Sequence, residues 1–330
     1  MANPKPERGV RMGDINTKSL QSDAAGMKQA AEILRTGGLL AFPTETVYGL
    51  GADATQNFAV ARIYAAKGRP NFNPLIAHFS DAASAKSHVI WSEEAEILSN
   101  AFWPGAMTLV LAKRQESSLS PLLSGGLFSV AIRIPDHLIA SDLLYQFSGP
   151  IAAPSANPSG AISPTTAEHV LSGLFGKIEG VIDGGACRLG LESTIIDLTT
   201  VPTLLRPGGI PAEIIENCLG KKLQVPRAED GIKAPGQLSS HYAPRARLRL
   251  NATKALNDEV LIGFGNMACD LNLSQDGDLT EAAAHLFAHL HFLDKKGVAD
   301  IAIAPIPEHG LGQAINDRLI RAATPRTKRI

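Results

Sequence analysis

Short apolar segments typical of strands alternate with segments of helical periodicity over the first two thirds of the chain. Apolar positions from Thr17 to Gly38 recur at helical spacing, and Gly37-Gly38 ends that predicted helix before a strand at Leu39–Phe42. Further strands are predicted at 75–79, 107–111, 130–134, 151–153, 181–182, 194–198 and 203–205. Further helices are predicted at 59–66, 82–88, 93–102, 136–147 and 165–175. The alternation predicts a mixed α/β domain over residues 15–219.

Residues 220–245 interrupt this alternation with a stretch rich in charge, glycine and proline. We predict a linker there, although Ala234-Pro235-Gly236 and His241-Tyr242-Ala243-Pro244 are more motif-like than a plain spacer needs. Beyond it, strands at 247–250, 260–265 and 301–305 and helices at 279–293 and 312–323 predict a short βαβ alternation. Residues 246–330 are therefore expected to form a second, smaller α/β domain.

Charge and cysteine content narrow the class of protein. The chain has 31 basic and 32 acidic residues, so no overall field attracts nucleic acid or a membrane surface. The three cysteines show no CxxC spacing, which argues against a disulfide framework and favours a reducing cytoplasm. No segment approaches the ~20 apolar residues that a membrane helix needs. We expect a soluble cytoplasmic protein of two domains, with 45% hydrophobic residues to build its cores.

Two cations stand out after the helix predicted at 59–66. Lys67 and Arg69 flank a glycine, and Pro70 then stops the helix, so a turn presents both charges together. This arrangement suits a phosphate or carboxylate ligand, because arginine binds such groups bidentately. The alternative is a solvated helix end whose cations complement the helix dipole. Thr44-Glu45-Thr46 also allows two interpretations. Either a strand delivers its hydroxyl groups to a cleft, or these groups cap a helix.

Arg133 lies within an apolar strand and must find an anion or hydrogen-bond partners there. Its partner is either a ligand or a structural ion pair with Asp183 or Glu192. The loop Ala153–Gly160 contains small and polar residues that could bring backbone amides close to a nucleotide, or it is an ordinary turn.

Several strands thus end in Thr, Ser, Asn or Arg, which is how open α/β folds assemble sites for polar, anionic ligands. Phosphate-binding glycine loops of the GxxxxGK[ST] and GxGxxG types are absent from the sequence, and so are zinc-binding spacings. The histidines His285, His289 and His291 have helical spacing but no cysteine or carboxylate beside them. We expect a solvated helix face there and no metal site in the protein.

Taken in order, these segments resemble the YrdC-type L-threonylcarbamoyladenylate synthases in their long, two-domain form. The matching motifs are Phe42–Leu50, Lys67–Pro70 with Asn73-Pro74-Leu75, Trp103-Pro104-Gly105 with Thr108, Val130–Arg133, Ala153–Asn157, Glu192-Ser193-Thr194, Leu205–Gly208 and the linker motifs from Ala234 to Pro244. The resemblance implies a twisted, mixed-sheet YrdC-like domain joined through the linker to a Rossmann-like C-terminal domain.

The resemblance also implies a reaction. The enzyme would condense L-threonine, bicarbonate or CO₂ and ATP into threonylcarbamoyl-AMP and pyrophosphate, with Mg²⁺ accompanying the ATP. The product would pass to a tRNA threonylcarbamoyl transferase complex that modifies tRNA next to the anticodon. Whether this chain touches tRNA directly is left open. Positioning and charge neutralisation can drive such chemistry without a nucleophilic side chain.

Residue roles follow from the same resemblance. Lys67 and Arg69 are the expected catalytic residues. The residues expected to bind threonine are Thr44, His78, Arg133, Ser155 and Ser193. Those expected to surround ATP are Lys67, Arg69, Thr108, Ser129, Asn157, Ser163, Arg206 and Tyr242.

The linker then gains a role, because we expect residues 234–244 to fold over the occupied cleft with Tyr242 inside. Two alternatives stay open at this point. One is an RNA-binding module with a YrdC-like fold, against which the net charge of −1 counts. The other is a carbamoyl-transferring maturation enzyme, but such proteins are longer and carry zinc-finger cysteines.

Overall fold

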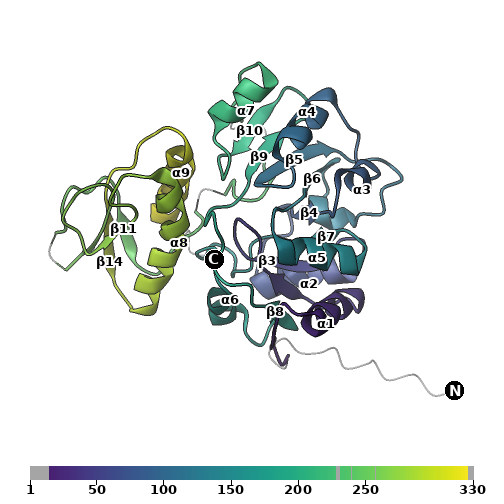
Figure 1. The fold of residues 1–330 in the computed structure, drawn as a ribbon, viewed down its shortest axis with the longest axis horizontal. Coiled ribbons are helices and arrows are strands. Elements are labelled where there is room, and N and C mark those ends of the chain that lie inside the picture. Colours follow the sequence, from purple (N-terminus) through teal and green to yellow (C-terminus); the bar gives the residue numbers. More distant parts are fainter. Residues whose placement is uncertain (1–14, 228–230, 239, 257, 326–330) are drawn as a thin grey trace.

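The computed structural model describes residues 15–227, 231–238, 240–256 and 258–325, and it contains two sheets (Figure 1). The larger has the strand order β1-β8-β2-β3-β7-β4-β6-β5-β9-β10, and the smaller has the order β11-β14-β12-β13. The strands of the larger sheet are β1 (Lys18–Leu20), β2 (Leu40–Phe42), β3 (Gly49–Asp53), β4 (Ile76–His78), β5 (Met107–Ala112), β6 (Ser129–Arg133), β7 (Ile151–Ala152), β8 (Gly180–Ile182), β9 (Thr194–Asp197) and β10 (Thr203–Arg206).

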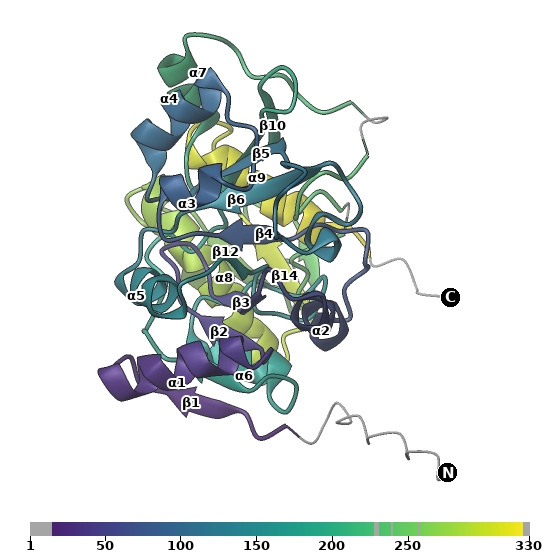
Figure 2. The ribbon, with the colours of Figure 1, turned by 90° about the vertical axis from the view of Figure 1, so that its right-hand side faces the viewer.

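Helices cover the larger sheet and close its ends. They are α1 (Ala24–Arg35), α2 (Asn57–Lys67), α3 (Ala82–Lys86), α4 (Glu93–Phe102), α5 (Leu138–Phe147), α6 (Ala167–Leu174) and α7 (Ala212–Leu219), with a 3₁₀ turn η1 at Pro121–Ser124. Figure 2 shows α1 and α6 at one end of the sheet and α4 and α7 at the other. The chain leaves this domain after α7, which packs on α4.

Mixed pairing brings the ends of several strands into one row. β4 and β6 are parallel, β5 and β6 are antiparallel, and β5 and β9 are parallel. The register places His78 opposite Arg133, and Arg133 opposite Thr108. Residues that stand opposite one another in a sheet present their side chains on the same face. Three side chains predicted for the site therefore lie side by side on one face of the sheet.

Three local features of the large domain differ from the prediction. Thr17–Gly38 was expected to be helical throughout, but Lys18–Leu20 form β1, which pairs with β8 in parallel. Helix α1 begins only after Asp23, whose carboxylate accepts a hydrogen bond from the Gly26 amide at 2.8 Å. Strand β3 was not predicted, because glycines weaken a strand signal. Gly51 is needed there, since a Cβ at this position would lie 2.9 Å from the Phe42 ring. Helix α7 was also not predicted.

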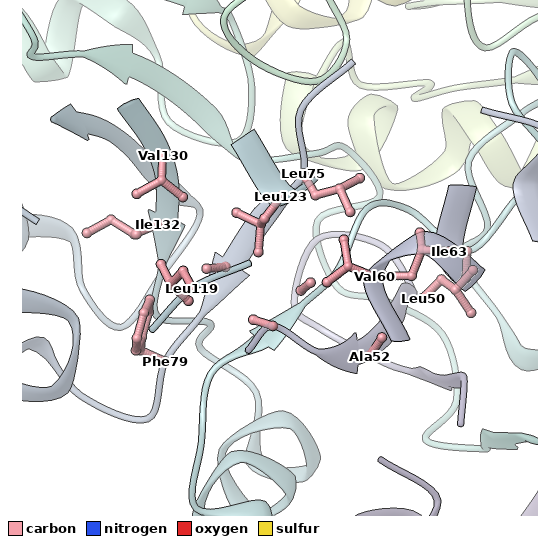
Figure 3. Close-up of a cluster of buried hydrophobic side chains, with 14 of the residues drawn as sticks. Leu50, Ala52, Val60, Ile63, Leu75, Phe79, Leu119, Leu123, Val130 and Ile132 are labelled. Carbon is pink, nitrogen blue, oxygen red and sulfur yellow. The ribbon is translucent and has the colours of Figure 1, made fainter. Parts of the chain in front are cut away.

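One hydrophobic core of the large domain lies between the sheet and α2, and a second lies between the sheet and helices α1 and α5. Figure 3 shows Leu50, Val60, Ile63, Leu75 and Ile132 among the buried side chains of the first core. Each of these five is fully buried, and burying one such side chain stabilises the fold by about 1.5–3 kcal/mol. The first core thus fixes β3, β4 and β6 against one another, and with them the strand ends that carry the polar groups.

The C-terminal domain is a parallel sheet with two long helices on one face. Its strands are β11 (Arg247–Arg249), β12 (Val260–Gly263), β13 (Leu271–Asn272) and β14 (Asp300–Ile303), and its helices are α8 (Leu279–Lys295) and α9 (Leu311–Ala323). This agrees with the predicted βαβ alternation except for the short β13, which was not predicted. Both helices lie between the small sheet and the large domain (Figure 1). No helix among the described residues is long and apolar enough to cross a membrane.

A core substitution in β6 tests this packing. We expect Ile132→Ala to lower the free energy of unfolding of the large domain by about 2–5 kcal/mol, because it leaves a cavity under the sheet. The matched control is Ile90→Ala, since Ile90 is 58% exposed in the same domain, and its effect should stay within about 0.5 kcal/mol. Urea unfolding followed by circular dichroism measures both, and equal effects would contradict the assigned core.

Candidate active site

A small cavity of about 40 Å³ lies where the strand ends of the large sheet meet the linker. Its walls come from the turns after β2 and α2, from β4 and the end of β6, from the loop after β7, from the segment that precedes β9 and from the end of β10. The linker supplies the remaining wall. The lining residues are Thr44, Thr46, Val47, Gly49, Arg69, Ile76, His78, Arg133, Ala153, Pro154, Ser155, Glu192, Ser193, Arg206, Pro235, Gly236, His241 and Tyr242.

Arg133 is held by a buried ion pair. Its Nη2 donates to Glu45 Oε1 at 2.6 Å and its Nε donates to the carbonyl of Gly105 at 3.2 Å. The structural partners predicted for it, Asp183 and Glu192, were therefore wrong, since Glu45 takes that place. Arg133 still lines the cavity. A carboxylate ligand entering here would meet a guanidinium that is already oriented.

The turn after β2 sets hydroxyl groups beside Arg133. Thr44 Oγ1 donates to the carbonyl of Val47 at 2.7 Å and lies 2.7 Å from Thr46 Oγ1. No helix follows, because the next element is β3, so the helix-cap alternative for Thr44-Glu45-Thr46 was wrong. His78 completes this wall. Burial, and then the charge of Arg133, lower the pKa of His78 to about 3, so the ring is neutral at ordinary pH.

Lys67 and Arg69 are buried rather than solvated, with 4% and 6% of their surface exposed, so the solvated helix-end alternative was wrong. Gly68 ends α2 in the left-handed conformation at φ 59°, which turns the chain between the two cations. Lys67 Nζ donates to the backbone carbonyls of Ser155 and Asn157. Arg69 donates to the Asn73 side chain at 2.7 Å and to the carbonyl of Pro74 at 2.8 Å.

Arg206, at the end of β10, is a third buried cation. It donates to the carbonyl of Ser193 at 2.9 Å, to Ser193 Oγ at 3.1 Å and to the linker carbonyl of Pro235 at 3.3 Å. Among the residues that the structure describes, no carboxylate forms a salt bridge with Lys67, Arg69 or Arg206. Burial lowers the pKa of all three: that of Lys67 well below its usual range, and that of Arg69 to about 10.

The linker reaches into the cavity rather than merely covering it. Tyr242 is 1% exposed, and its hydroxyl has no hydrogen-bond partner in the described part of the chain. His241 packs edge-on against Tyr242 with ring centroids 4.0 Å apart, and burial lowers its pKa to about 3. Gly236 adopts φ 86°, and a Cβ there would lie 2.7 Å from Arg206 Cδ and 2.8 Å from the Tyr242 hydroxyl.

Besides Lys67, three predicted nucleotide residues near the cavity lie outside its lining. Thr108 Oγ1 is 2.7 Å from Ser193 Oγ, Ser163 Oγ donates to Glu192 Oε1 at 2.5 Å, and the Asn157 amide donates to the carbonyl of Ala161 at 2.8 Å. The Asn157 side-chain oxygen is buried without a partner among the described residues.

Ser129 is placed elsewhere. It begins β6, whereas Arg133 ends that strand, and it is outside the cavity lining. The structure thus gathers the predicted threonine and nucleotide residues around one cavity, with Ser129 apart from the rest.

The three α8 histidines have structural partners. A ring nitrogen of His285 and one of His289 lie 2.8 and 3.0 Å from the carbonyls of Leu273 and Asn272. His291 stacks on His169 of the large domain with ring centroids 3.8 Å apart. Among the described residues, no three His, Cys, Asp or Glu side chains are grouped so that they could hold a metal ion.

Sequence reasoning missed several residues of the site. Glu45 and Glu192 stood inside quoted motifs, but nothing local distinguished them from solvated carboxylates. His241 and Gly236 were noted only as members of the linker motifs, without a role in the site. Arg318, which contacts Glu192 Oε2 at 2.9 Å, lies in a helix with no motif of its own, so no signal in the sequence could have found it.

Comparisons with known proteins agree with this arrangement. One family model, described as telomere recombination, matches residues 32–208, and a second, described as the C-terminal domain of threonylcarbamoyl-AMP synthase, matches residues 210–324. The threonylcarbamoyl-AMP synthase of Pyrococcus abyssi is 43% identical over 320 residues, which cover 89% of this chain and 93% of that protein.

Solved structures extend the match. The crystal structure of P. abyssi Sua5 complexed with L-threonine aligns with a TM-score of 0.85 at 39% identity and covers 93% of this chain and 98% of its own. The crystal structure of E. coli YciO shares the fold over 59% of this chain and 96% of its own, with a TM-score of 0.53 at 24% identity. Both family models and the full-length relative cover the two domains in the same order, so the chain belongs to the threonylcarbamoyl-AMP synthase family.

Proposed function

We propose that this protein condenses L-threonine, bicarbonate or CO₂ and ATP into threonylcarbamoyl-AMP, with release of pyrophosphate. The observation that carries the proposal is the set of three buried cations, Lys67, Arg69 and Arg206, which have no carboxylate partner among the described residues. Buried charges without counter-charges are costly, so the site is built for an anion that a ligand supplies. The names of the full-length relatives support the same reaction.

Threonine belongs at the wall formed by Arg133, Thr44 and His78. The oriented guanidinium of Arg133 suits the amino acid carboxylate, as in other arginine–carboxylate pairs. The neutral His78 ring and the Thr44 hydroxyl offer hydrogen bonds without adding charge. Threonine as the substrate is supported by the P. abyssi structure complexed with L-threonine.

ATP belongs at the wall formed by Arg69 and Arg206, behind which Lys67 donates to the carbonyl of the lining residue Ser155. The threonine amine adds to CO₂ to give a carbamate, and a carbamate oxygen attacks the α-phosphorus of ATP. An O–P bond forms there, the bond from the α-phosphorus to the bridging oxygen breaks, and pyrophosphate leaves with its electron pair. The three cations offset the negative charge that builds up in this transfer, which is how most phosphoryl-transfer sites work. Mg²⁺ enters as part of the substrate on the ATP phosphates.

Substrate entry requires the linker to move. A cavity of about 40 Å³ is far below the roughly 300–1,000 Å³ of ordinary ligand pockets, because His241 and Tyr242 fill the space. The linker therefore withdraws to admit ATP and threonine and returns over them. Closure then excludes water from the mixed anhydride of the product.

The same placement argues against the RNA-binding alternative. Lys67, Arg69, Arg133 and Arg206 are each at most 6% exposed, so a folded RNA backbone cannot reach them. The product instead passes to a separate tRNA-modifying transferase. The three cysteines are unpaired, which supports the cytoplasm as the compartment in which this takes place.

Reconstitution tests the function directly. Pyrophosphate release from ATP should require both threonine and bicarbonate, with threonylcarbamoyl-AMP detected by mass spectrometry. Lys67→Ala should lower kcat/KM for ATP by about 100-fold or more, as expected when a charge-stabilising donor is removed. Lys254→Ala, at an exposed position of the C-terminal domain, is the control and should retain activity. Release that proceeds without threonine would contradict the proposal.

Proton linkage tests the placement of Lys67. Burial holds the Lys67 pKa well below its usual range in the free protein, and bound phosphate stabilises the ammonium and raises that pKa. Between the two pKa values, ATP binding takes up a proton, so ATP affinity should fall as pH rises. Calorimetry in buffers of different ionisation enthalpy measures the uptake above the last ionisation of ATP. Lys67→Met should abolish it, and unchanged uptake would rule out Lys67 as the source.

A linker glycine tests the approach of the linker to Arg206. We expect Gly236→Ala to lower kcat/KM for ATP by about tenfold, because the added methyl group displaces Arg206 or Tyr242. Gly231→Ala is the matched control, since Gly231 is also a linker glycine with positive φ, at 67°, but no atom of the described residues lies within 4 Å of its added Cβ. Equal losses in both variants would mean that backbone strain, not crowding at Arg206, is responsible.

A further inference from the structure

One arginine of the C-terminal domain is buried against the catalytic domain. Arg318, in α9, is 1% exposed, yet most of its partners lie outside its own domain. Its Nε donates to Glu192 Oε2 at 2.9 Å and its Nη1 donates to the carbonyl of Pro207 at 2.9 Å. Its neighbour Asp317 is a second acceptor, at 2.7 Å. A buried guanidinium is stable only with such partners, so the two domains are locked together at this point.

Glu192 needs this partner because of where it stands. It lines the cavity beside Ser193 and Arg206, on the wall assigned to the ATP phosphates. Burial by itself raises the pKa of Glu192, but the charges of Arg318 and Arg206, together with hydrogen bonds from Ser163 and Arg318, lower it, so the group is an anion. Without Arg318, only Arg206 would offset the charge of this carboxylate, which would face the triphosphate and repel it. The groups that surround Glu192 are Ser163, Arg206, His241, Tyr242 and Arg318.

Arg318 also holds the linker in the cleft. Its guanidinium carbon lies 5.1 Å from the centre of the Tyr242 ring, on which the ring of Phe287 in α8 also stacks, with the centroids 5.7 Å apart. A cation over an aromatic face is attracted to it, and more strongly where water is excluded. Tyr242 therefore contacts both helices of the C-terminal domain.

The end of α9 fixes the linker backbone as well. Arg321 Nη1 donates to the carbonyl of Leu238 at 2.7 Å, and the His241 amide donates to the carbonyl of Arg321 at 3.3 Å. Ser240 Oγ donates to the carbonyl of Thr324 at 3.1 Å. These three hydrogen bonds attach the linker to the end of α9, so the linker and the C-terminal domain are held together.

We propose that Arg318 is a positioning residue for the synthase reaction, which neutralises Glu192 on the nucleotide wall and fixes Tyr242 over the cavity. The C-terminal domain thereby completes the nucleotide half of a site whose other groups all come from the large domain and the linker. The inference rests on the proposed function. It gives the domain a defined contribution to ATP binding, whereas threonine binding at Arg133 should be independent of it.

The test measures steady-state pyrophosphate release with ATP and with threonine varied in turn. Arg318→Met should raise the KM for ATP by about tenfold or more, within the usual range of site-to-site coupling, and leave the KM for threonine within about threefold. Arg318→Met combined with Glu192→Gln removes both charges together. Its KM for ATP should be lower than that of Arg318→Met by about fivefold or more, because contacting residues couple in a double-mutant cycle.

Arg247→Met is the matched control, since Arg247 is an exposed arginine of the same domain paired with Asp300. It should keep the wild-type KM for both substrates. Thermal unfolding of each variant identifies a failure to fold. If Arg318→Met does not fold, Arg318→Lys replaces it, with a KM for ATP raised by about threefold to tenfold, because one ammonium neutralises Glu192 but cannot also reach Pro207 and cover Tyr242.

Several outcomes would overturn the inference. A wild-type KM for ATP in Arg318→Met or Arg318→Lys would do so, and so would equal increases in the KM for both substrates. A double variant no better than Arg318→Met would mean that Glu192 is not the charge being neutralised. Failure of the proposed function is distinguishable, since the wild-type protein itself would then show no threonine-dependent release of pyrophosphate.

Discussion

The structure depends on burying positive charge beside a cavity without supplying matching negative charge. Lys67, Arg69 and Arg206 are held by backbone carbonyls and by the side chains of Asn73 and Ser193, which orient the cations but leave their charge uncompensated. Such an arrangement is unfavourable in a folded protein unless the rest of the fold over-determines it. The packed strands β3, β4 and β6 supply that rigidity. The buried cations thus destabilise the large domain locally, and an anionic ligand offsets this destabilisation.

Charge is distributed unevenly around the cavity, and the two carboxylates explain how. Glu45 is committed to Arg133 and Glu192 is committed to Arg318, so neither reduces the charge of the three cations through a salt bridge. The arginine that pairs with Glu45 lies in the large domain, and the arginine that pairs with Glu192 lies in the C-terminal domain. The two ends of the cavity therefore differ in their dependence on the small domain.

Much of this could be predicted from the sequence, for physical reasons that also explain what could not. The apolar runs of β2, β5 and β6 and the Lys67-Gly68-Arg69 turn are local patterns, and local patterns survive into the structure. Strand β3 was not predicted because its glycines, which weaken a strand signal, are required by a tertiary contact with Phe42. The ion pairs of Glu45 and Arg318 were not predicted, because an ion pair depends on a partner that the local sequence does not identify. Arg318 is 126 residues from Glu192, and no local feature of α9 points to that contact.

The linker residues that fill the cavity set a condition for any inhibitor of this protein. A compound aimed at the ATP site binds only molecules in which His241 and Tyr242 have withdrawn, and its apparent affinity is reduced by the fraction of molecules in that open state. Compounds that occupy the place of the Tyr242 ring between Phe287 and Arg318 bind the same open state and carry the same penalty, but once bound they keep the linker from closing over the site.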